Sequence, residues 1–278
     1  MVERTKAHPL LLIATVVLLR ATPLFAQFDF PTMSGGTAAL GGMTVAVNDP
    51  TTAYATVADL AALPTTIVTL SVRQNIMADG LSLASAAVAT PLPFGGMALS
   101  AIHFGDAEYN EQNIALAYAL PLGREIAFGA AFHYLHSATS DPYYTPLHRL
   151  TFSLAVRYNP SDELSIAFRT FNPVAVVSDR SEGVHTPGIF SLGLSYLLNE
   201  ELLAAAEVEK NLFYDATLRL GLQYRFMSRY FARMGIATKP RLYSFGFGGR
   251  WEHLGADLAF QFSTPLGPTP LISLAYSF

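Results

Sequence analysis

The chain of 278 residues is apolar and sparsely charged: 51% of its residues are hydrophobic, 14% are charged, and the formal net charge is −4. The lack of cysteine excludes a disulfide framework and thiolate metal sites, and the negative charge offers no basic patch, so we expect no nucleic-acid partner. Because the apolar residues are spread evenly after residue 26, without a run long enough for a spanning helix, the composition is typical of a membrane β-barrel.

The first 26 residues have the pattern of a secretory signal peptide. Two basic residues, Arg4 and Lys6, precede an apolar run over residues 10–19. Ala26 then ends a candidate cleavage region. The alternative, a membrane anchor, is disfavoured because the run is shorter than the roughly 20 residues that a spanning helix needs. We therefore predict cleavage after Ala26 and export from the cytoplasm.

Residues 27–64 differ in composition from the rest of the chain. They are rich in glycine, alanine and threonine, with glycine pairs at 35–36 and 41–42. Neither pair follows a strand of a βαβ unit, so close packing of the backbone is expected rather than a phosphate-binding loop. We predict that this segment forms a hatch inside a barrel, where Asp49 and Asp59 are its candidates for ion pairs.

From residue 65 to residue 278 the chain consists of short segments in which apolar and small or polar residues alternate. Alternation at period two puts successive side chains on opposite faces of a strand, as a barrel between lipid and a polar lumen requires. We predict an all-β fold, a transmembrane antiparallel barrel of about fourteen strands. The expected strands are 66–73, 82–92, 95–104, 112–121, 125–136, 149–158, 163–171, 190–198, 201–209, 215–226, 229–238, 241–251, 254–263 and 270–278.

The links between the expected strands support a closed barrel. Links after even-numbered strands have two to four residues, whereas the two longest links, 137–148 and 172–189, follow odd-numbered strands. This rhythm matches short periplasmic turns and longer external loops. A soluble β-sandwich would also alternate, but it would carry charged residues on its exposed face, where this chain has mostly Gly, Ala and Ser.

The carboxyl terminus has the pattern of the closing strand of an outer-membrane barrel. Tyr276 and Phe278 share one face with Ile272 and Leu274, and small residues occupy the other face. We expect Tyr276 and Phe278 to form the signal that the barrel-assembly machinery binds. The location expected from both ends of the chain is the bacterial cell outer membrane, with outer-membrane lipid as a partner.

Charged residues on the predicted lumen face form the candidate site. They are Arg157, Arg169, Glu207, Glu209, Arg219, Arg225, Arg233, Arg250 and Asp257. Ion-pair ladders that brace the barrel are the favoured role, and a solute path lined by arginine is the sharper alternative. For the hatch aspartates, the expected arginine partners are Arg219, Arg225 and Arg250.

No motif for catalysis stands out in the sequence. The histidines show no HExxH pattern, and no nucleophile is paired with a recognisable base. We therefore expect a protein that is not an enzyme and that holds no cofactor and no metal.

The segment from Gly36 to Asp49, followed by Ala53-Tyr54 and by residues 58–61, resembles the opening of the PorV/PorQ family of outer-membrane barrels. That family is distantly related to the FadL transporters of hydrophobic solutes. The family pattern has Asn-Pro where this chain has Thr56-Val57. The resemblance implies a fourteen-stranded barrel whose amino-terminal segment fills the lumen as a hatch.

The resemblance also implies two functions. PorV/PorQ proteins work with the type IX secretion apparatus and in cell-surface attachment, whereas FadL-like relatives pass hydrophobic compounds. We therefore predict a role in type IX secretion or cell-surface assembly, with secretion-system proteins as partners. The alternative is a FadL-like transporter or channel for small hydrophobic solutes.

Overall fold

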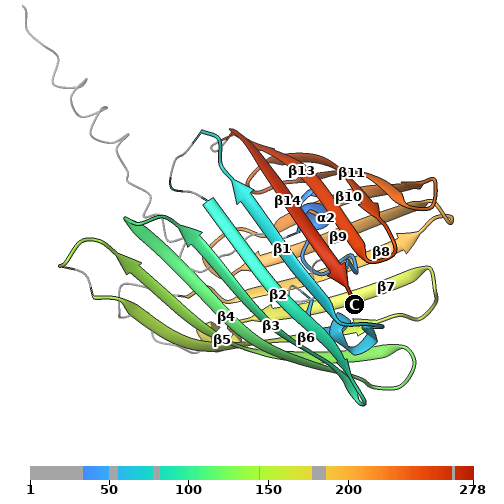
Figure 1. Cartoon of the computed structure of the whole chain (residues 1–278), viewed down its shortest axis with the longest axis horizontal. Helices are drawn as coiled ribbons and strands as arrows, with labels where there is room; N and C mark the ends of the chain where they lie inside the picture. Colours follow the sequence, from blue (N-terminus) through green and yellow to red (C-terminus); the bar gives the residue numbers. More distant parts are fainter. Residues whose placement is uncertain are drawn as a thin grey trace, which may run out of the picture.

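Fourteen antiparallel strands close into a barrel in the computed structural model of the chain (Figure 1). The structure describes residues 34–49, 56–77, 80, 82–143, 145–176, 186–264 and 267–278. Each strand pairs with its neighbours in sequence, and β1 closes the barrel by pairing with β14. The strands are β1 (Ile67–Gln74), β2 (Ser82–Leu92), β3 (Gly95–Gly105), β4 (Tyr109–Pro121), β5 (Ile126–Thr139), β6 (Leu147–Tyr158), β7 (Leu164–Phe171), β8 (Ile189–Leu197), β9 (Leu202–Asn211), β10 (Thr217–Phe226), β11 (Tyr230–Ala237), β12 (Leu242–Arg250), β13 (Leu254–Ser263) and β14 (Gly267–Ser277). The predicted fourteen-stranded barrel is confirmed.

Alternation along the strands separates an apolar outer face from a lumen face of small and polar residues. In β10, Leu218, Leu220 and Leu222 are each more than two-fifths exposed, while Thr217 and Gly221 are buried. A side chain exposed on the outside of such a barrel contacts lipid, so an apolar outer row is stable there and would not be in water. The strict period of two fixes which residues reach the lumen.

The two ends of the barrel differ in their connections. At the end that we call the turn end, the links after β2, β4, β6, β8, β10 and β12 are short; at the opposite loop end, the longest link follows β7. Strands β5 and β6 extend beyond their predicted ends, to Thr139 and from Leu147, because their ladder continues through the pair His136 and His148. The link at 140–146 is therefore shorter than predicted.

Two short helical segments lie inside the barrel: the α-helix α2 (Gly35–Ala38) and the 3-10 helix η2 (Val57–Ala62) (Figure 1). We call the described residues 34–49 and 56–62 the hatch. A third segment, the 3-10 helix η3 (Pro173–Val176), follows β7. None of the helices in the described ranges is long and apolar enough to cross a membrane. The predicted signal peptide, residues 1–26, lies outside the described residues, and the domain boundaries stay predictions.

The two helical segments of the hatch are buried against different parts of the wall. Helix α2 contacts β12, β13 and β14, whereas η2 contacts β2 to β6. Leu40, Met43 and Leu60 are at most 1% exposed. Burial of each such side chain stabilises the folded state by roughly 1.5–3 kcal/mol relative to exposure, so the hatch adds apolar clusters shared with the wall to those that the wall forms by itself.

Small residues in the wall make room for the hatch backbone. A Cβ added at Gly129 on β5 would lie 2.7 Å from the backbone nitrogen of Ala58, and one added at Gly235 on β11 would overlap the backbone of Gly41. Around η2 the wall consists largely of buried alanines of β2 to β6. The glycine and alanine that the sequence places on the lumen face therefore mark the path of the hatch.

Candidate functional site: hatch contacts and the cavity beside them

One wall carboxylate holds the first half of the hatch by its backbone. Glu207 on β9, which is 1% exposed, accepts hydrogen bonds from the backbone nitrogens of Thr44 (2.9 Å), Val45 (2.8 Å) and Ala46 (3.0 Å). Successive backbone N–H groups that converge in this way form a strong binding site for an anion. Glu207 therefore fixes residues 44–46 at one place on the wall.

One wall arginine joins the two halves of the hatch. Arg157 on β6 pairs through Nε and Nη2 with the carboxylate of Asp59 in η2, and the same Nη2 donates to the carbonyl oxygen of Val45 at 3.0 Å. Its Nη1 donates to Ser165 Oγ at 2.7 Å. Because guanidinium presents several donors in a rigid plane, one side chain can satisfy all three partners at once.

A chain of four charges holds the end of the first half. Arg250 Nη2 lies 3.3 Å from Asp49 Oδ1 and 2.7 Å from Asp257 Oδ2, and Arg233 Nη1 lies 2.6 Å from Asp257 Oδ1. Gln223 accepts from Arg233 Nε at 2.6 Å. Two arginines and two aspartates balance one another here, which satisfies the demand that buried charges be paired.

The structure brings most of the predicted lumen charges together, with two changes to the expected pairs. Arg250 is a predicted partner of the hatch and does pair with Asp49, but Asp59 pairs with Arg157. Arg219 pairs instead with Glu207 and Glu209, because Glu207 lies directly opposite it in the ladder of β9 and β10. Arg219, one of three arginines expected as possible partners of the hatch aspartates, therefore pairs with glutamates of the wall.

Arg225 lies outside this network. It is exposed at the turn end of β10, beyond the hatch, where its Nη2 donates to the carbonyl oxygen of Glu200. The aromatic residues of the predicted assembly signal, Tyr276 and Phe278, are 46% and 68% exposed, and their rings meet edge to face. Their recognition by assembly machinery stays a prediction.

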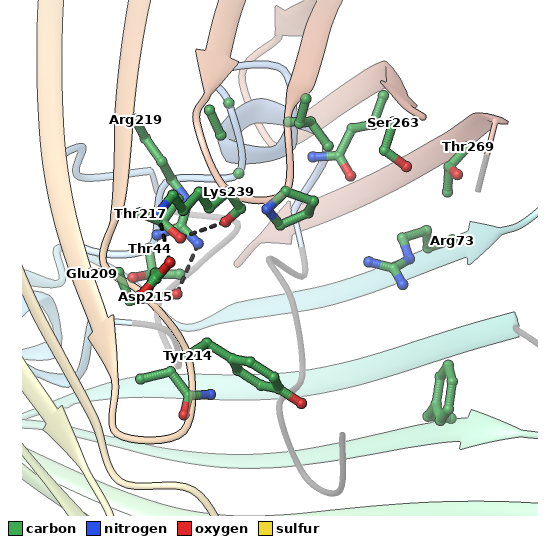
Figure 2. A pocket seen from close by; sticks show the side chains of 18 of the residues that line it. Thr44, Arg73, Glu209, Tyr214, Asp215, Thr217, Arg219, Lys239, Ser263 and Thr269 are labelled. Carbon is green, nitrogen blue, oxygen red and sulfur yellow. Dashed lines mark hydrogen bonds and ion pairs between the residues drawn. The ribbon is translucent and has the colours of Figure 1, made fainter. Parts of the chain in front are cut away.

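A cavity of about 650 Å³ remains at the loop end of the lumen, next to the hatch (Figure 2). Gly41, Gly42 and Thr44 of the hatch line one side of it, and Lys239 and Pro240 of the link after β11 line another. Its apolar lining comes from Phe104, Tyr214, Ala237, Pro240 and Leu242; its charged lining is Arg73, Glu111, Arg169, Glu209, Asp215, Arg219 and Lys239. The cavity is thus an amphipathic chamber with the hatch in its wall.

Most of the charged side chains in the chamber have partners. Glu209 accepts from Arg219 Nη2 at 2.8 Å, and Tyr109 donates its hydroxyl to Glu111 at 2.5 Å. Lys239 pairs with Asp215 at 2.6 Å, and this hydrogen bond and the lysine charge lower the pKa of Asp215. In the described part of the chain, no group of three or more His, Asp or Glu residues could hold a metal ion.

Arg73 and Glu111 were not among the residues predicted for the site. Both lie on the lumen face near the loop end, where Arg73 follows Thr69 and Ser71 at period two along β1. Extending that alternation to the end of the strand would have placed Arg73 in the lumen. The two residues extend the charged lining of the chamber to β1 and β4, and Figure 2 shows Arg73 on the side away from Arg219.

Comparison with known proteins identifies the fold. No protein-family model and no curated protein matches the chain. Among solved structures, a Pseudomonas aeruginosa FadL homologue is 13% identical, with a TM-score of 0.67 over 91% of this chain and 100% of that one. The Ralstonia pickettii toluene transporter TbuX is 11% identical, with a TM-score of 0.66 over 91% of this chain and 100% of its own. The P. putida toluene transporter TodX is 10% identical, with a TM-score of 0.66 over 90% and 99%. At these identities the likeness concerns the fold alone: the chain has the fold of the FadL-like outer-membrane β-barrels.

Proposed function

We propose that this protein is an outer-membrane channel for small hydrophobic solutes, which bind in the chamber at the loop end and pass when the hatch shifts. The observation that carries the proposal is the chamber of about 650 Å³ beside hatch residues 41–44. A chamber of this volume lies within the range of small-molecule binding sites. The structural likeness to barrels described as toluene transporters supports the same function.

The secretion role that the PorV/PorQ resemblance implies has less support. It rests on the resemblance of residues 36–61, and the structures compared above are FadL-like barrels. An assembly component needs a plugged lumen and an exposed partner surface. Its function does not require a ligand-sized chamber beside the hatch, whereas transport does. We therefore place the transport function first.

Uptake of a labelled hydrophobic compound tests the proposal. Toluene should enter intact Gram-negative cells faster when the full chain is expressed than when it is absent, since lipopolysaccharide slows the passage of apolar molecules. A lock on the hatch supplies the control. In the double variant Leu40→Cys with Gly221→Cys the two Cβ atoms would lie 3.1 Å apart, so a shift of a few tenths of an ångström brings them to the roughly 3.5–4.5 Å of a disulfide.

The locked protein should lose the added uptake under oxidising conditions and regain it with a reductant. Because the native chain has no cysteine, the single variant Leu40→Cys controls for the thiol itself. Equal uptake with and without the protein would overturn the proposed function. Uptake that is unchanged by the oxidised lock would show that solutes do not pass this part of the hatch.

A further inference from the structure

One cation in the chamber differs from the others in having no partner among the described residues. Arg73 Nε is buried without a hydrogen bond, and Arg73 takes part in none of the ion pairs in this part of the chain. Its ladder partners, Leu83 on β2 and Leu271 on β14, are both 1% exposed and face the lumen. The arginine therefore lies in the chamber, on the side away from Arg219 and Glu209 (Figure 2).

Among the residues that line the chamber, basic residues exceed acidic ones by one. The lining holds four basic residues and three acidic ones, and each of the acids has its own partner. A buried guanidinium without a counter-charge is destabilising, and an anion that occupies the chamber would remove that penalty. A single unpaired cation favours a single negative charge.

An apolar surface lies close to Arg73 on the same wall. Phe104 on β3 is opposite Leu83, which is opposite Arg73, so the three residues form one row across β1, β2 and β3. Neighbouring strands are about 4.8 Å apart, which places the backbones of Arg73 and Phe104 roughly 10 Å from each other. A ligand between their side chains would present a charged end to one and an apolar body to the other.

From this placement we propose that the chamber selects small aromatic monocarboxylates over neutral hydrocarbons, with Arg73 binding the carboxylate and Phe104 contacting the ring. The flat fork of guanidinium matches the two oxygens of a carboxylate. A molecule of the size of benzoate is well within the chamber volume of about 650 Å³. The proposal rests on the transport function above and adds the chemical class of the solute.

Binding of benzoate and benzamide to the detergent-purified full chain tests the proposal. The two molecules have nearly the same shape and differ in charge, so titration calorimetry separates recognition of the anion from that of the ring. We expect benzoate to bind at least tenfold more tightly than benzamide. Arg73→Gln should weaken benzoate roughly 10- to 100-fold and leave benzamide unchanged, since a hydrogen bond to a charged group is worth about that factor.

Two variants serve as controls. Arg73→Lys keeps the charge without the fork and should retain part of the preference for benzoate. Arg225→Gln removes an exposed arginine at the turn end, away from the chamber, and should change nothing. Equal affinities for benzoate and benzamide in the native protein would overturn the proposal even if Arg73→Gln does not fold. Full retention of benzoate binding by folded Arg73→Gln would overturn it as well.

Uptake and binding measured together distinguish failure of the proposed solute class from failure of the proposed transport function. Toluene uptake that depends on the protein, together with equal affinity for benzoate and benzamide, would overturn the solute class alone. Benzoate binding that requires Arg73, without protein-dependent uptake of either compound, would support the site and overturn the channel.

Discussion

The filled and the hollow parts of the lumen are lined by the same strands but by different side chains. On β10, Gly221 faces the hatch at Leu40, and the next inward residue towards the loop end is Arg219, which lines the chamber. On β12, a Cβ added at Gly246 would touch Ala39 of the hatch, whereas Leu242, further towards the loop end, lines the chamber. The size of the inward residue thus decides where the hatch backbone fits and where space is left.

The two parts also differ in what binds their charges. Beside the hatch, wall carboxylates and arginines are satisfied by hatch groups, as in the contacts of Glu207 and Arg157. In the chamber, pairs form between wall residues, and Arg73 has no partner among the residues that the structure describes. The hatch is therefore held by ion pairs and hydrogen bonds as well as by packing. In the chamber, the guanidinium of Arg73 is left for the proposed ligand.

Removal of the hatch is the strongest test of this difference. Deleting residues 28–50 should turn a barrel of negligible conductance in planar bilayers into a pore of clearly higher conductance, because the lumen would lose Leu40, Met43 and the groups that pair with Glu207. Substitution of Asp49 or Asp59 by alanine should loosen the hatch only in part, since each removes one of several contacts. An intact protein that already conducts steadily, with no change on deletion, would show that the segment is not a plug.

Substitution of two glutamates on β9 distinguishes the contribution of hatch contacts to stability from that of contacts within the wall. Glu207 and Glu209 both pair with Arg219, but only Glu207 binds the backbone of residues 44–46. Glu207→Gln should lower the free energy of unfolding by about 3 kcal/mol or more, since it leaves buried partners without their charge. Glu209→Gln should lower it less. Urea unfolding in lipid vesicles, followed by the fluorescence of the single tryptophan, Trp251, measures both. Equal losses would mean that the bond to the hatch backbone contributes nothing.

A pair of glycines tests the steric part of the comparison. Gly235 and Gly221 face each other across β11 and β10. A Cβ at Gly235 would overlap the hatch backbone, whereas one at Gly221 would meet the side chains of Leu40 and Met43 at 3.0–3.1 Å. Gly235→Ala should therefore destabilise the protein by roughly 1–3 kcal/mol and raise conductance, and Gly221→Ala should do less. A larger effect at Gly221 would contradict the position of the hatch.

The strands were predictable because lipid demands strict alternation on the outer face. The prediction ended β5 at residue 136 and began β6 at 149, since apolar residues give way to His136 and His148 there. Backbone pairing does not need apolar side chains, and the ladder continues to Ser137 and Leu147. The alternation of side chains thus predicts that a strand is present, whereas its length depends on how far the backbone pairs with the neighbouring strands.

The site was predictable only in part. Period two assigned the charges to the lumen, but the partner of each depends on the path of the hatch, which has no repeating pattern. Asp59 reaches Arg157 because η2 lies against β2 to β6, a placement set by the alanines of those strands. Arg73 was not predicted as a site residue because it is a single charge at the end of a strand of eight residues. A charged residue at that position is common where a strand passes into a loop.

The smallest expected effect belongs to the exposed pair of the chamber, Asp215 and Lys239. Their side chains are 77% and 58% exposed, so water and salt screen the attraction, in contrast to the buried pairs of the hatch. The pKa of Asp215 is lowered in the folded protein, mainly by the hydrogen bond from Lys239, so its contribution to stability is present above the ordinary aspartate pKa and is lost as the pH falls through the lowered value. Asp215→Asn should thus differ slightly from the native protein in urea unfolding at pH 7 and low salt, and match it at high salt or in strong acid. A large, salt-independent loss would show that this pair holds the chamber together, as the buried pairs hold the hatch.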